Sequence, residues 1–266
     1  MKAIILNQPK DFAVKEIELP ELKEGEVLIR IKDSGICTND VRDFNGDCSY
    51  SYPRIGGHEY CGVIEELGSG VNKKRFSKGQ KVVQYIIDDC RECFFCKHGE
   101  ENICEEHPKS KIFTNPDGLS GYGGFAEFVV AKAEDLFVYP DSTSFEKMAF
   151  TEPLACVVNS ITRTNIQFGD DVAVIGGGTM GMLHVMLAKL KGARVILSEP
   201  LKERRDRAQK LGCDDVIDPM AEDAAEKVKK LTGGRGAQVV FNTTAIPAVA
   251  AQACLLYTSD AADELD

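Results

Sequence analysis

Four cysteines lie close together in the first half of the sequence and could bind a metal ion. Cys90, Cys93, Cys96 and Cys104 follow the spacing C-x2-C-x2-C-x7-C in the segment CRECFFCKHGEENIC. Four thiolates can close a tetrahedral shell around zinc, and a closed shell leaves no position for substrate, which is typical of a structural site. An iron–sulfur cluster is the alternative, but the ferredoxin pattern places three residues before its fourth cysteine and a proline after it. Here seven residues precede that cysteine and Glu105 follows it, so the spacing favours structural zinc.

A glycine-rich turn in the second half has the residues needed to bind a dinucleotide. The segment VAVIGGGTMG places Gly176, Gly178 and Gly181 as G-x-G-x-x-G after a predicted strand, with Thr179 and Met180 opening a helix. The first glycine permits a tight turn, the second lets the backbone approach a pyrophosphate, and the third allows close packing of helix and strand. The start of the helix then offers free N–H groups to the phosphates.

Two charged residues near the end of the next predicted strand bear on the choice of cofactor. Glu199 lies 18 residues after Gly181, where an acid can accept hydrogen bonds from the adenosine ribose. A carboxylate there repels a 2′-phosphate, so NAD is favoured over NADP, although Arg204 and Arg205 leave room for the opposite choice. Thr243 ends the fourth predicted strand, where parallel sheets bind ligands, and is a candidate for the nicotinamide side.

A second set of metal-binding residue types comes from two separate segments. His58 and Glu59 stand in the glycine-rich segment GGHEYCG, and Cys37 stands 21 residues before His58 in GICTND. A cysteine and a histidine from separate segments could hold zinc and leave one position for substrate. By spacing alone this indication is weak, because a single buried cysteine is more often a small core residue.

The elements that would position these residues change in character along the chain. Residues 1–140 contain short alternating or apolar runs separated by Gly, Pro, Asp and Asn, which is typical of strands. From Asp171 onward four predicted strands alternate with helices over 179–191, 201–211 and 221–231, which predicts a parallel sheet with right-handed crossovers. We therefore expect a β-rich domain over residues 1–150, with the cysteine lobe at about 88–106, and an α/β domain over 151–253.

These motifs together resemble the medium-chain zinc-dependent alcohol and polyol dehydrogenases. Residues 57–71, GHEYCGVIEELGSGV, are similar to the family's zinc signature G-H-E-x-x-G-x5-G-x2-V, and the four-cysteine lobe, GGFAEFVV, EPLAC and the glycine-rich turn follow in the family's order. The resemblance covers residues 1–253. It implies a GroES-like catalytic domain beside a Rossmann doubly wound parallel sheet, with the active site in the cleft between them. It also implies NAD-dependent oxidation of an alcohol or polyol whose hydroxyl is activated by zinc.

The resemblance also implies individual roles. Cys37 and His58 match the ligands of the catalytic zinc, and Glu59 matches the adjoining carboxylate. Glu152, in TEPLAC, matches the third protein ligand of the sorbitol, butanediol and threonine dehydrogenase branch, where the liver-type branch has cysteine. The glutamate at this position favours polyols or other secondary alcohols as substrates. The alternative is that Glu152 forms a structural salt bridge or a contact at the end of a helix.

The proton relay of the family is altered in this sequence. Two residues after the zinc cysteine the family commonly has Ser or Thr, and five after it often His, whereas this chain has Asn39 and Arg42. An amide does not titrate and a guanidinium stays protonated, so neither is a natural general base. Asn39 stays a candidate catalytic residue by position, and the proton is expected to leave through water and Glu59 or Glu152.

The composition limits the possible partners and the compartment. Lys+Arg 32 against Asp+Glu 42 gives a net charge of −10, which is poorly suited to binding nucleic acid or anionic membranes. The sequence has no signal peptide and no membrane-spanning stretch, so its ten cysteines indicate thiols or metal ligands in a cytoplasmic protein. The remaining cysteines and His98, His107 and His184 are interpreted as packed or surface side chains.

The last residues do not fit the pattern of the rest. Residues 254–266, beginning CLLYTSDAADE, have no cap and no periodicity and resemble a sequencing adapter translated in frame, so we exclude them from the fold. The alternative is a natural helix end within AVAAQACLLY. With four Rossmann strands where the fold has six, we expect a C-terminally truncated protein with an unpaired sheet edge that folds poorly or is inactive.

Two function classes remain open from the sequence. The first is a zinc-dependent dehydrogenase whose full-length form is a homo-oligomer, a dimer or a tetramer. The second is a non-catalytic relative that binds zinc and a dinucleotide, such as a redox sensor, and the departures at Asn39 and Arg42 support it.

Overall fold

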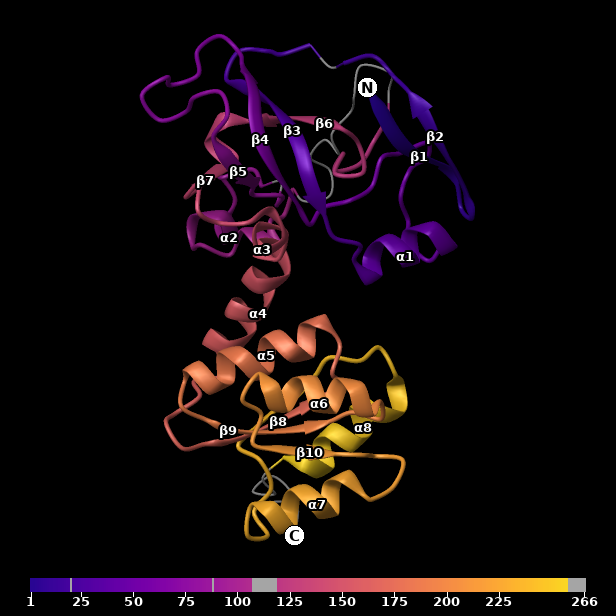
Figure 1. Ribbon diagram of the computed structural model, residues 1–266, viewed down its shortest axis with the longest axis vertical. Coiled ribbons are helices and arrows are strands. Elements are labelled where there is room, and N and C mark those ends of the chain that lie inside the picture. The colour runs from indigo at the N-terminus through magenta and orange to yellow at the C-terminus, as the bar shows by residue number, and fades with distance from the viewer. Residues whose placement is uncertain (20, 88, 107–118, 258–266) are drawn as a thin grey trace. The chain divides into compact units, whose positions relative to one another are not determined.

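The computed structural model describes residues 1–19, 21–87, 89–106 and 119–257, and the chain forms two compact units (Figure 1). The first unit is Met1–Glu152 and the second is Pro153–Asp266. Each has its own hydrophobic core, so each is described by itself. His107 and residues 258–266 lie outside the described residues.

The first unit is built on antiparallel strands. A five-stranded sheet has the order β6-β3-β4-β5-β7, and a separate pair joins β1 and β2. The strands are β1 Lys2–Gln8, β2 Asp11–Glu16, β3 Glu26–Ser34, β4 Tyr60–Leu67, β5 Lys81–Gln84, β6 Phe128–Lys132 and β7 Leu136–Tyr139. The prediction of a β-rich first part of the chain is confirmed.

Apolar side chains from neighbouring strands of this sheet form its core. Val27 and Ile29 of β3 are fully buried with Ile64 of β4 and Leu136 of β7, because residues two apart on a strand face the same side. Short helices lie in the connections: α1 Thr38–Asn45, α2 Phe94–Lys97, α3 Phe145–Ala149 and the 3₁₀ turns η1 Glu101–Ile103 and η2 Ala133–Asp135. No predicted helix corresponds to α1, although this helix carries one side of a candidate site.

The second unit has the predicted parallel sheet. Its strands are β8 Asp171–Ile175, β9 Arg194–Ser198, β10 Asp215–Ile217 and β11 Val239–Asn242, in the order β10-β9-β8-β11. The helices are α4 Thr151–Arg163, α5 Thr179–Leu190, α6 Lys202–Lys210, α7 Ala224–Leu231 and α8 Pro247–Leu256. The chain order therefore reverses direction next to β8, the strand that leads into the glycine-rich turn.

The sequence of β8 alternates between two cores. Val172 and Val174 pack in one cluster with residues of α4, α5 and α6, whereas Ala173 and Ile175 pack in another with residues of α7 and α8. Alternate residues of a strand point to opposite faces, so an entirely apolar strand must be covered on both sides. Helices on both faces of a parallel sheet make this a doubly wound fold, as expected.

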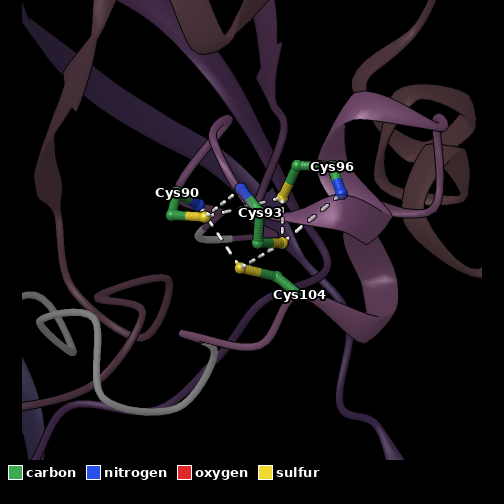
Figure 2. Close-up of side chains that lie close together, drawn as sticks. All are labelled: Cys90, Cys93, Cys96 and Cys104. Atoms are coloured by element: carbon green, nitrogen blue, oxygen red, sulfur yellow. Dashed lines mark hydrogen bonds between the residues drawn. The ribbon is translucent and has the colours of Figure 1, made fainter.

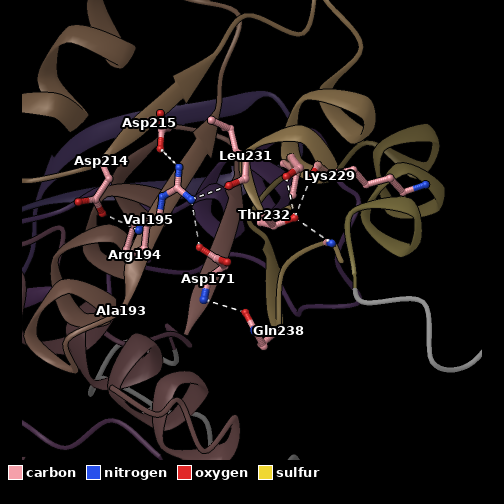
Figure 3. Close-up of polar contacts among 12 residues, drawn as sticks. Asp171, Ala193, Arg194, Val195, Asp214, Asp215, Lys229, Leu231, Thr232 and Gln238 are labelled. Carbon is pink, nitrogen blue, oxygen red and sulfur yellow. Dashed lines mark hydrogen bonds and ion pairs between the residues drawn. The ribbon is translucent and has the colours of Figure 1, made fainter. Parts of the chain in front are cut away.

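A polar network ties together the strand ends opposite the glycine-rich turn. Arg194, the first residue of β9, donates from Nη2 to Asp215 at 2.7 Å and from Nη1 to the carbonyl of Leu231 at 2.7 Å (Figure 3). Its Nη1 also lies 3.6 Å from Asp171 Oδ1, and the Asp171 N–H donates to Gln238 Oε1. These contacts link the starts of β8, β9 and β10 and hold their register, so the turns at the opposite edge have fixed anchor points.

The last described residues correct one expectation. Residues 254–256 were excluded from the fold, yet they belong to α8, and Leu256 is only 1% exposed in the core beneath the sheet. The Ala237 N–H donates to the Leu256 carbonyl at 2.8 Å, and Tyr257 forms a parallel bridge with Ala237. Residues 254–256 are therefore helical, because their apolar side chains have a surface to cover, and the adapter origin of residues 254–266 stays a prediction. Within the described part of the chain, no helix combines the length and hydropathy required to cross a bilayer.

Candidate metal and dinucleotide sites

The four cysteines of the first unit converge on one point. The sulfur atoms of Cys90, Cys93, Cys96 and Cys104 all lie within 4.8 Å of one another (Figure 2). The Cys93–Cys96, Cys90–Cys96 and Cys93–Cys104 sulfur pairs are 3.4, 3.9 and 4.0 Å apart. A tetrahedron with zinc–sulfur bonds of about 2.3 Å has edges of about 3.8 Å, so these separations suit one ion at the centre.

Backbone geometry makes Cys93 a good anionic ligand, whereas Cys96 resists ionisation. Cys93 is the residue that caps α2, and hydrogen bonds from the backbone, led by the Cys96 N–H, lower the pKa of Cys93 to about 6. Burial and the neighbouring sulfurs raise the pKa of Cys96 to about 12. Ionising all four thiols together therefore requires a cation at the centre, and the donor set fits zinc.

An arginine fastens this lobe to the body of the first unit. Arg91 donates to Asp135 Oδ1 at 2.9 Å and lies 3.1 Å from Glu134 Oε1, both on the turn η2. The lobe is thereby held against the segment that leads into β7, which is consistent with a structural role.

Cys37, His58 and Glu59 also come together. Their ligand atoms lie within 4.8 Å of one another, and His58 is buried. Cys37 caps the start of α1, whereas His58 and Glu59 immediately precede β4. The segment after β3 and the segment before β4 meet because these two strands pair antiparallel from Val27 opposite Leu67 to Ser34 opposite Tyr60.

Asp40 orders this cluster, and the sequence analysis did not identify it. Its Oδ2 accepts the Cys37 N–H at 2.8 Å, its Oδ1 accepts the Gly57 N–H at 3.2 Å, and Oδ1 lies 3.6 Å from His58 Nδ1. Burial raises the pKa of Asp40, but His58 and the two backbone N–H groups lower it overall. An acid three residues after Cys37 at a helix start is the capping-box pattern, and that signal could have revealed it.

Two glycines leave room for the ligands. A Cβ on Gly35 would lie 2.3 Å from Glu59 Oε2 and 3.1 Å from Glu59 Cβ, so Gly35 makes space for the carboxylate. Gly57 has φ +83°, and a Cβ there would meet Phe125 Cδ1 at 2.6 Å. Both positions need glycine for steric reasons that are visible only in the folded chain.

The electrostatics of the cluster suit a divalent cation. Burial lowers the pKa of His58, but the neighbouring Asp40 carboxylate and Cys37 thiol raise it to about 10. The site thus carries a negative potential that stabilises positive charge at the imidazole. Sulfur, nitrogen and carboxylate oxygen donors from three side chains fit zinc and leave one tetrahedral position for another ligand.

Three further residues considered for this site have the following surroundings. Glu152 is the second residue of α4, is half-buried, and is not among the described residues that make up the cluster within 4.8 Å. Asn39 Nδ2 donates to the Tyr50 hydroxyl at 3.2 Å, and the Cys48 thiol donates to Asn39 Oδ1 at 3.8 Å. Arg42 is exposed on α1.

The glycine-rich turn of the second unit has the expected steric requirements. Gly176 has φ +95°, and a Cβ on Gly181 would lie 1.8 Å from the Gly176 carbonyl oxygen. The turn and the start of α5 therefore pack too closely for a side chain at position 181. Nothing lies within 4 Å of a Cβ built on Gly178, so that position is open to a ligand. Thr179 is exposed at the start of α5, and Met180 is partly buried against the core.

Thr243 and Glu199 both hold the glycine-rich turn. The Thr243 hydroxyl donates to the Ile175 carbonyl at 2.9 Å and lies 3.1 Å from the Gly176 carbonyl. Glu199 Oε2 accepts the Gly177 N–H at 2.6 Å, and Oε1 accepts the Leu201 N–H at 2.8 Å. Thr243 therefore contacts the turn from the β11 side and Glu199 from the β9 side.

The side chains interpreted as packed or surface residues include both kinds where the structure describes them. His184 is buried on α5, and its ring lies 4.4 Å from that of Phe241. Cys61 and Cys213 are buried, Cys48 is half-buried and Cys156 is exposed. His98 is exposed and lies against the ring of Phe94.

Two family models match the chain. The alcohol dehydrogenase GroES-like domain matches residues 23–141, and the zinc-binding dehydrogenase model matches residues 179–261. The first covers the two cysteine-containing clusters, and the second covers most of the parallel-sheet unit.

Curated proteins and solved structures are similar over most of the chain. An alcohol dehydrogenase of Geobacillus stearothermophilus is 36% identical over 248 residues, which are 90% of this chain and 70% of the relative. A sorbitol dehydrogenase of Halalkalibacterium halodurans is 35% identical over 93% of this chain and 71% of the relative. The structure of a zinc-binding dehydrogenase from Sinorhizobium meliloti bound to NADP has a TM-score of 0.88 at 30% identity, covering 97% of this chain and 74% of that one.

Proposed function

Because the chain belongs to the family of zinc-binding alcohol dehydrogenases with a GroES-like domain, we propose that it transfers a hydride between a polyol or other secondary alcohol and NAD. The observation that carries this proposal is the convergence of Cys37, His58 and Glu59 on one point of the first unit. Bound zinc would supply the Lewis acidity that favours loss of the hydroxyl proton, and bound NAD would accept the hydride.

Residues of this chain would prepare the site in three ways. Cys37 and His58 would hold the metal, with the Asp40 carboxylate, 3.6 Å from His58 Nδ1, orienting the imidazole electrostatically. Glu59 would supply a carboxylate that binds the metal or exchanges with water. Glu152 would complete the ligand set of the polyol branch.

The route of the hydroxyl proton would differ from the family's usual relay. Asn39 has no titratable proton, and its amide is engaged by Tyr50 and Cys48. We therefore assign proton transfer to water and the carboxylates of Glu59 or Glu152. Asn39 would act by positioning the substrate.

The remaining parts of the proposal concern the cofactor, the partners and the cell compartment. The glycine-rich turn, Thr179, Met180 and Thr243 would bind the dinucleotide, and the negative charge of Glu199 would favour NAD over NADP. The partner would be a small-molecule alcohol or polyol. A cytoplasmic homo-oligomer, a dimer or a tetramer, is the proposed full-length form.

Metal analysis combined with a substrate screen tests the function. Two zinc ions per chain are expected, with NADH formation from polyols or secondary alcohols by the proposed full-length form. Cys37→Ser should lower the count from two to one, and Cys93→Ser should remove the other ion. One zinc per chain, unaffected by Cys37→Ser, and no turnover would instead support the non-catalytic zinc- and dinucleotide-binding relative.

A separate variant tests the role of Glu152. Glu152→Gln keeps the size of the side chain but removes its charge, so turnover with the best alcohol should fall at least tenfold. Zinc content, measured in the same preparation, shows whether the variant has lost a zinc ligand or only a group that carries the proton. A variant with full zinc and full turnover would rule out both roles.

A further inference from the structure

One strand of the first unit, β2, has an edge without a neighbouring strand. β2 pairs only with β1, in a register that sets Ala13 opposite Ile5. The other side of β1 is covered by bridges to Arg54 and Ala126, so β1 lies between β2 and the rest of the unit (Figure 1). Within the described part of the chain, no strand adjoins the outer edge of β2. Such an edge can pair with a strand of another molecule.

The hydrogen bonds of β1 show which backbone groups of β2 point outward. The N–H groups of Ile4 and Leu6 donate away from β2, at 2.8 and 2.9 Å, to carbonyls elsewhere in the unit. The residues of β1 that alternate with these two must therefore bond to β2, because successive residues of a strand direct their backbone groups to opposite sides. Val14 lies opposite Ile4 and Phe12 lies opposite Leu6. The N–H and C=O groups of Phe12 and Val14 accordingly point out from the edge.

The side chains on one face of this strand pair are apolar and exposed. Ile4 is 40% exposed, Phe12 57% and Val14 64%. These side chains share a face, since Ile4 and Val14 are opposite each other and Phe12 is two residues from Val14. Asp11 and Lys15 are exposed on the other face of β2. The edge thus has unpaired backbone groups, apolar side chains and both signs of charge within six residues.

We propose that the outer edge of β2 pairs antiparallel with the same edge of a second copy of this chain, around a two-fold axis through Ala13. This axis sets Phe12 of each copy opposite Val14 of the other, so their outward N–H and C=O groups exchange paired hydrogen bonds. The inference rests on the homo-oligomer in the proposed function and assigns one surface to it. It concerns neither the metal sites nor hydride transfer.

Charge complementarity selects this register. Asp11 of each copy lies opposite Lys15 of the other, and opposite charges on facing residues of two strands attract. An axis through Val14 would also match the outward backbone groups, but it would set Phe12 opposite Glu16 and separate Asp11 from Lys15. The axis through Ala13 therefore satisfies the backbone, the apolar side chains and the charges together.

Cysteine cross-linking of the full chain tests the register. Facing residues of a non-hydrogen-bonded antiparallel pair have Cα atoms about 4.5 Å apart, which is within the range of a disulfide. Ala13→Cys should therefore link two copies through the introduced thiols on mild oxidation, and peptide mapping identifies the link.

Lys15→Cys is the matched control on the same strand and the same face. Its counterpart in the second copy would lie four residues further along, roughly 13 Å away, so linkage should be about tenfold lower than in Ala13→Cys. A mixture of Asp11→Cys and Lys15→Cys chains should form the mixed disulfide, because these two positions face each other.

Sedimentation equilibrium measures the strength of the association. Asp11→Lys sets like charges opposite each other at both ends of the paired segment and should weaken self-association about tenfold. Adding Lys15→Asp to the same chain restores opposite charges and should return the affinity to within about twofold of the wild type. Glu203→Lys makes the same change of charge on the exposed surface of α6 and should leave the affinity unchanged.

The Ala13→Cys link together with rescue by the double charge exchange supports the inference. Self-association without that link, or without that rescue, overturns the inference and leaves the proposed homo-oligomer to another surface. A chain that stays monomeric also overturns it. Zinc content and NADH formation report on the proposed enzymatic function separately, because Asp11, Ala13 and Lys15 belong to neither metal cluster.

Discussion

The candidate catalytic centre depends on residues that are too small or too remote to be ligands themselves. Gly35 has no side chain, and that absence leaves the volume that the Glu59 carboxylate occupies. Asp40 touches the backbone of both ligand-bearing segments and so keeps Cys37 and His58 in register. At the scale of single residues, the geometry of the site therefore depends on Gly35 and Asp40 as much as on the residues that supply the ligand atoms.

Gly35→Ala should displace Glu59 without unfolding the protein. The added Cβ would lie 2.3 Å from Oε2, and the flexible carboxylate can move away at low energetic cost. We expect affinity for the catalytic zinc to fall roughly tenfold to hundredfold, with the four-cysteine zinc retained. Metal content after dialysis against a chelator measures this.

Gly56→Ala is the control in the neighbouring segment. Its Cβ would meet Asp40 Oδ1 and Phe125 at 3.4 Å, which is an ordinary contact, so both zinc ions should stay. Equal zinc loss in the two variants would show that Gly35 has no special relation to Glu59.

Asp40→Asn should weaken the same centre from the other side. The amide has one acceptor oxygen in place of two and cannot serve the Cys37 N–H, the Gly57 N–H and His58 together. Changes at such supporting residues typically cost about tenfold to hundredfold in metal affinity. Competition with a chromogenic chelator gives the affinity, and unchanged affinity with an intact far-ultraviolet spectrum would contradict the role given to Asp40.

At the scale of elements, α5 is held both at its start and along its buried face. The Gly176 turn and Gly181 leave no gap between β8 and the helix, and Met182, Val185 and Ala188 pack on the sheet. His184 links α5 to α4: because a carbonyl only accepts, Nδ1 donates to the Met180 carbonyl at 2.8 Å, and Nε2 accepts from the Ser160 hydroxyl at 3.0 Å. This pattern requires a neutral imidazole.

His184 should make the second unit sensitive to acid. Burial lowers the pKa of His184 below the ordinary 6.5, although its hydrogen bond to Met180 opposes this. The folded state then binds fewer protons than the unfolded state, so the contribution of His184 is present above pH 6.5 and is lost as the pH falls below it. The urea midpoint should drop less between pH 7.5 and 5.5 in His184→Gln than in the wild type.

His98→Gln is the matched control for that experiment. His98 is exposed and lies against Phe94 outside both cores, so this variant should keep the pH dependence of the wild type. If His184→Gln and His98→Gln show the same pH dependence, the acid sensitivity comes from other groups.

At the scale of the whole molecule, the candidate metal sites and the candidate dinucleotide site belong to different compact units. Both cysteine-containing clusters belong to Met1–Glu152, and the glycine-rich turn, Glu199 and Thr243 belong to Pro153–Asp266. Because each unit has its own hydrophobic clusters, ligand binding to one should stabilise that one in particular.

Removal of metal should therefore affect only the first unit. A strong chelator is expected to lower the thermal midpoint of the first unit and expose the lobe between Cys90 and Cys104 to proteolysis, because the four sulfurs lose the ion that holds them together. Binding of 5′-AMP should change less than twofold, since its proposed site lies in the second unit. Differential scanning calorimetry with and without chelator or 5′-AMP tests this, and parallel loss of both transitions would contradict it.

The sequence by itself determined the local chemistry and the strand pattern. The spacing of Cys90, Cys93, Cys96 and Cys104 and of Gly176, Gly178 and Gly181 predicted both motifs, because each is formed by residues near one another in the chain. Alternating strands and helices after Asp171 likewise predicted the parallel sheet, and the order β10-β9-β8-β11 confirmed it. Short-range motifs can be predicted in this way because the conformation of each is determined by residues that are close together in the chain.

Only the tertiary structure decided what depends on contacts between distant segments. Asp40 orders His58, Gly35 makes room for Glu59, and Leu256 is buried under the sheet, and each relation spans strands or helices that no local pattern connects. The orientation of Glu199 is the clearest case: its position after β9 follows from the sequence, but its oxygens face the backbone N–H groups of Gly177 and Leu201. A buried carboxylate needs hydrogen-bond partners to offset the loss of water, and these two backbone N–H groups reach it only in the folded chain.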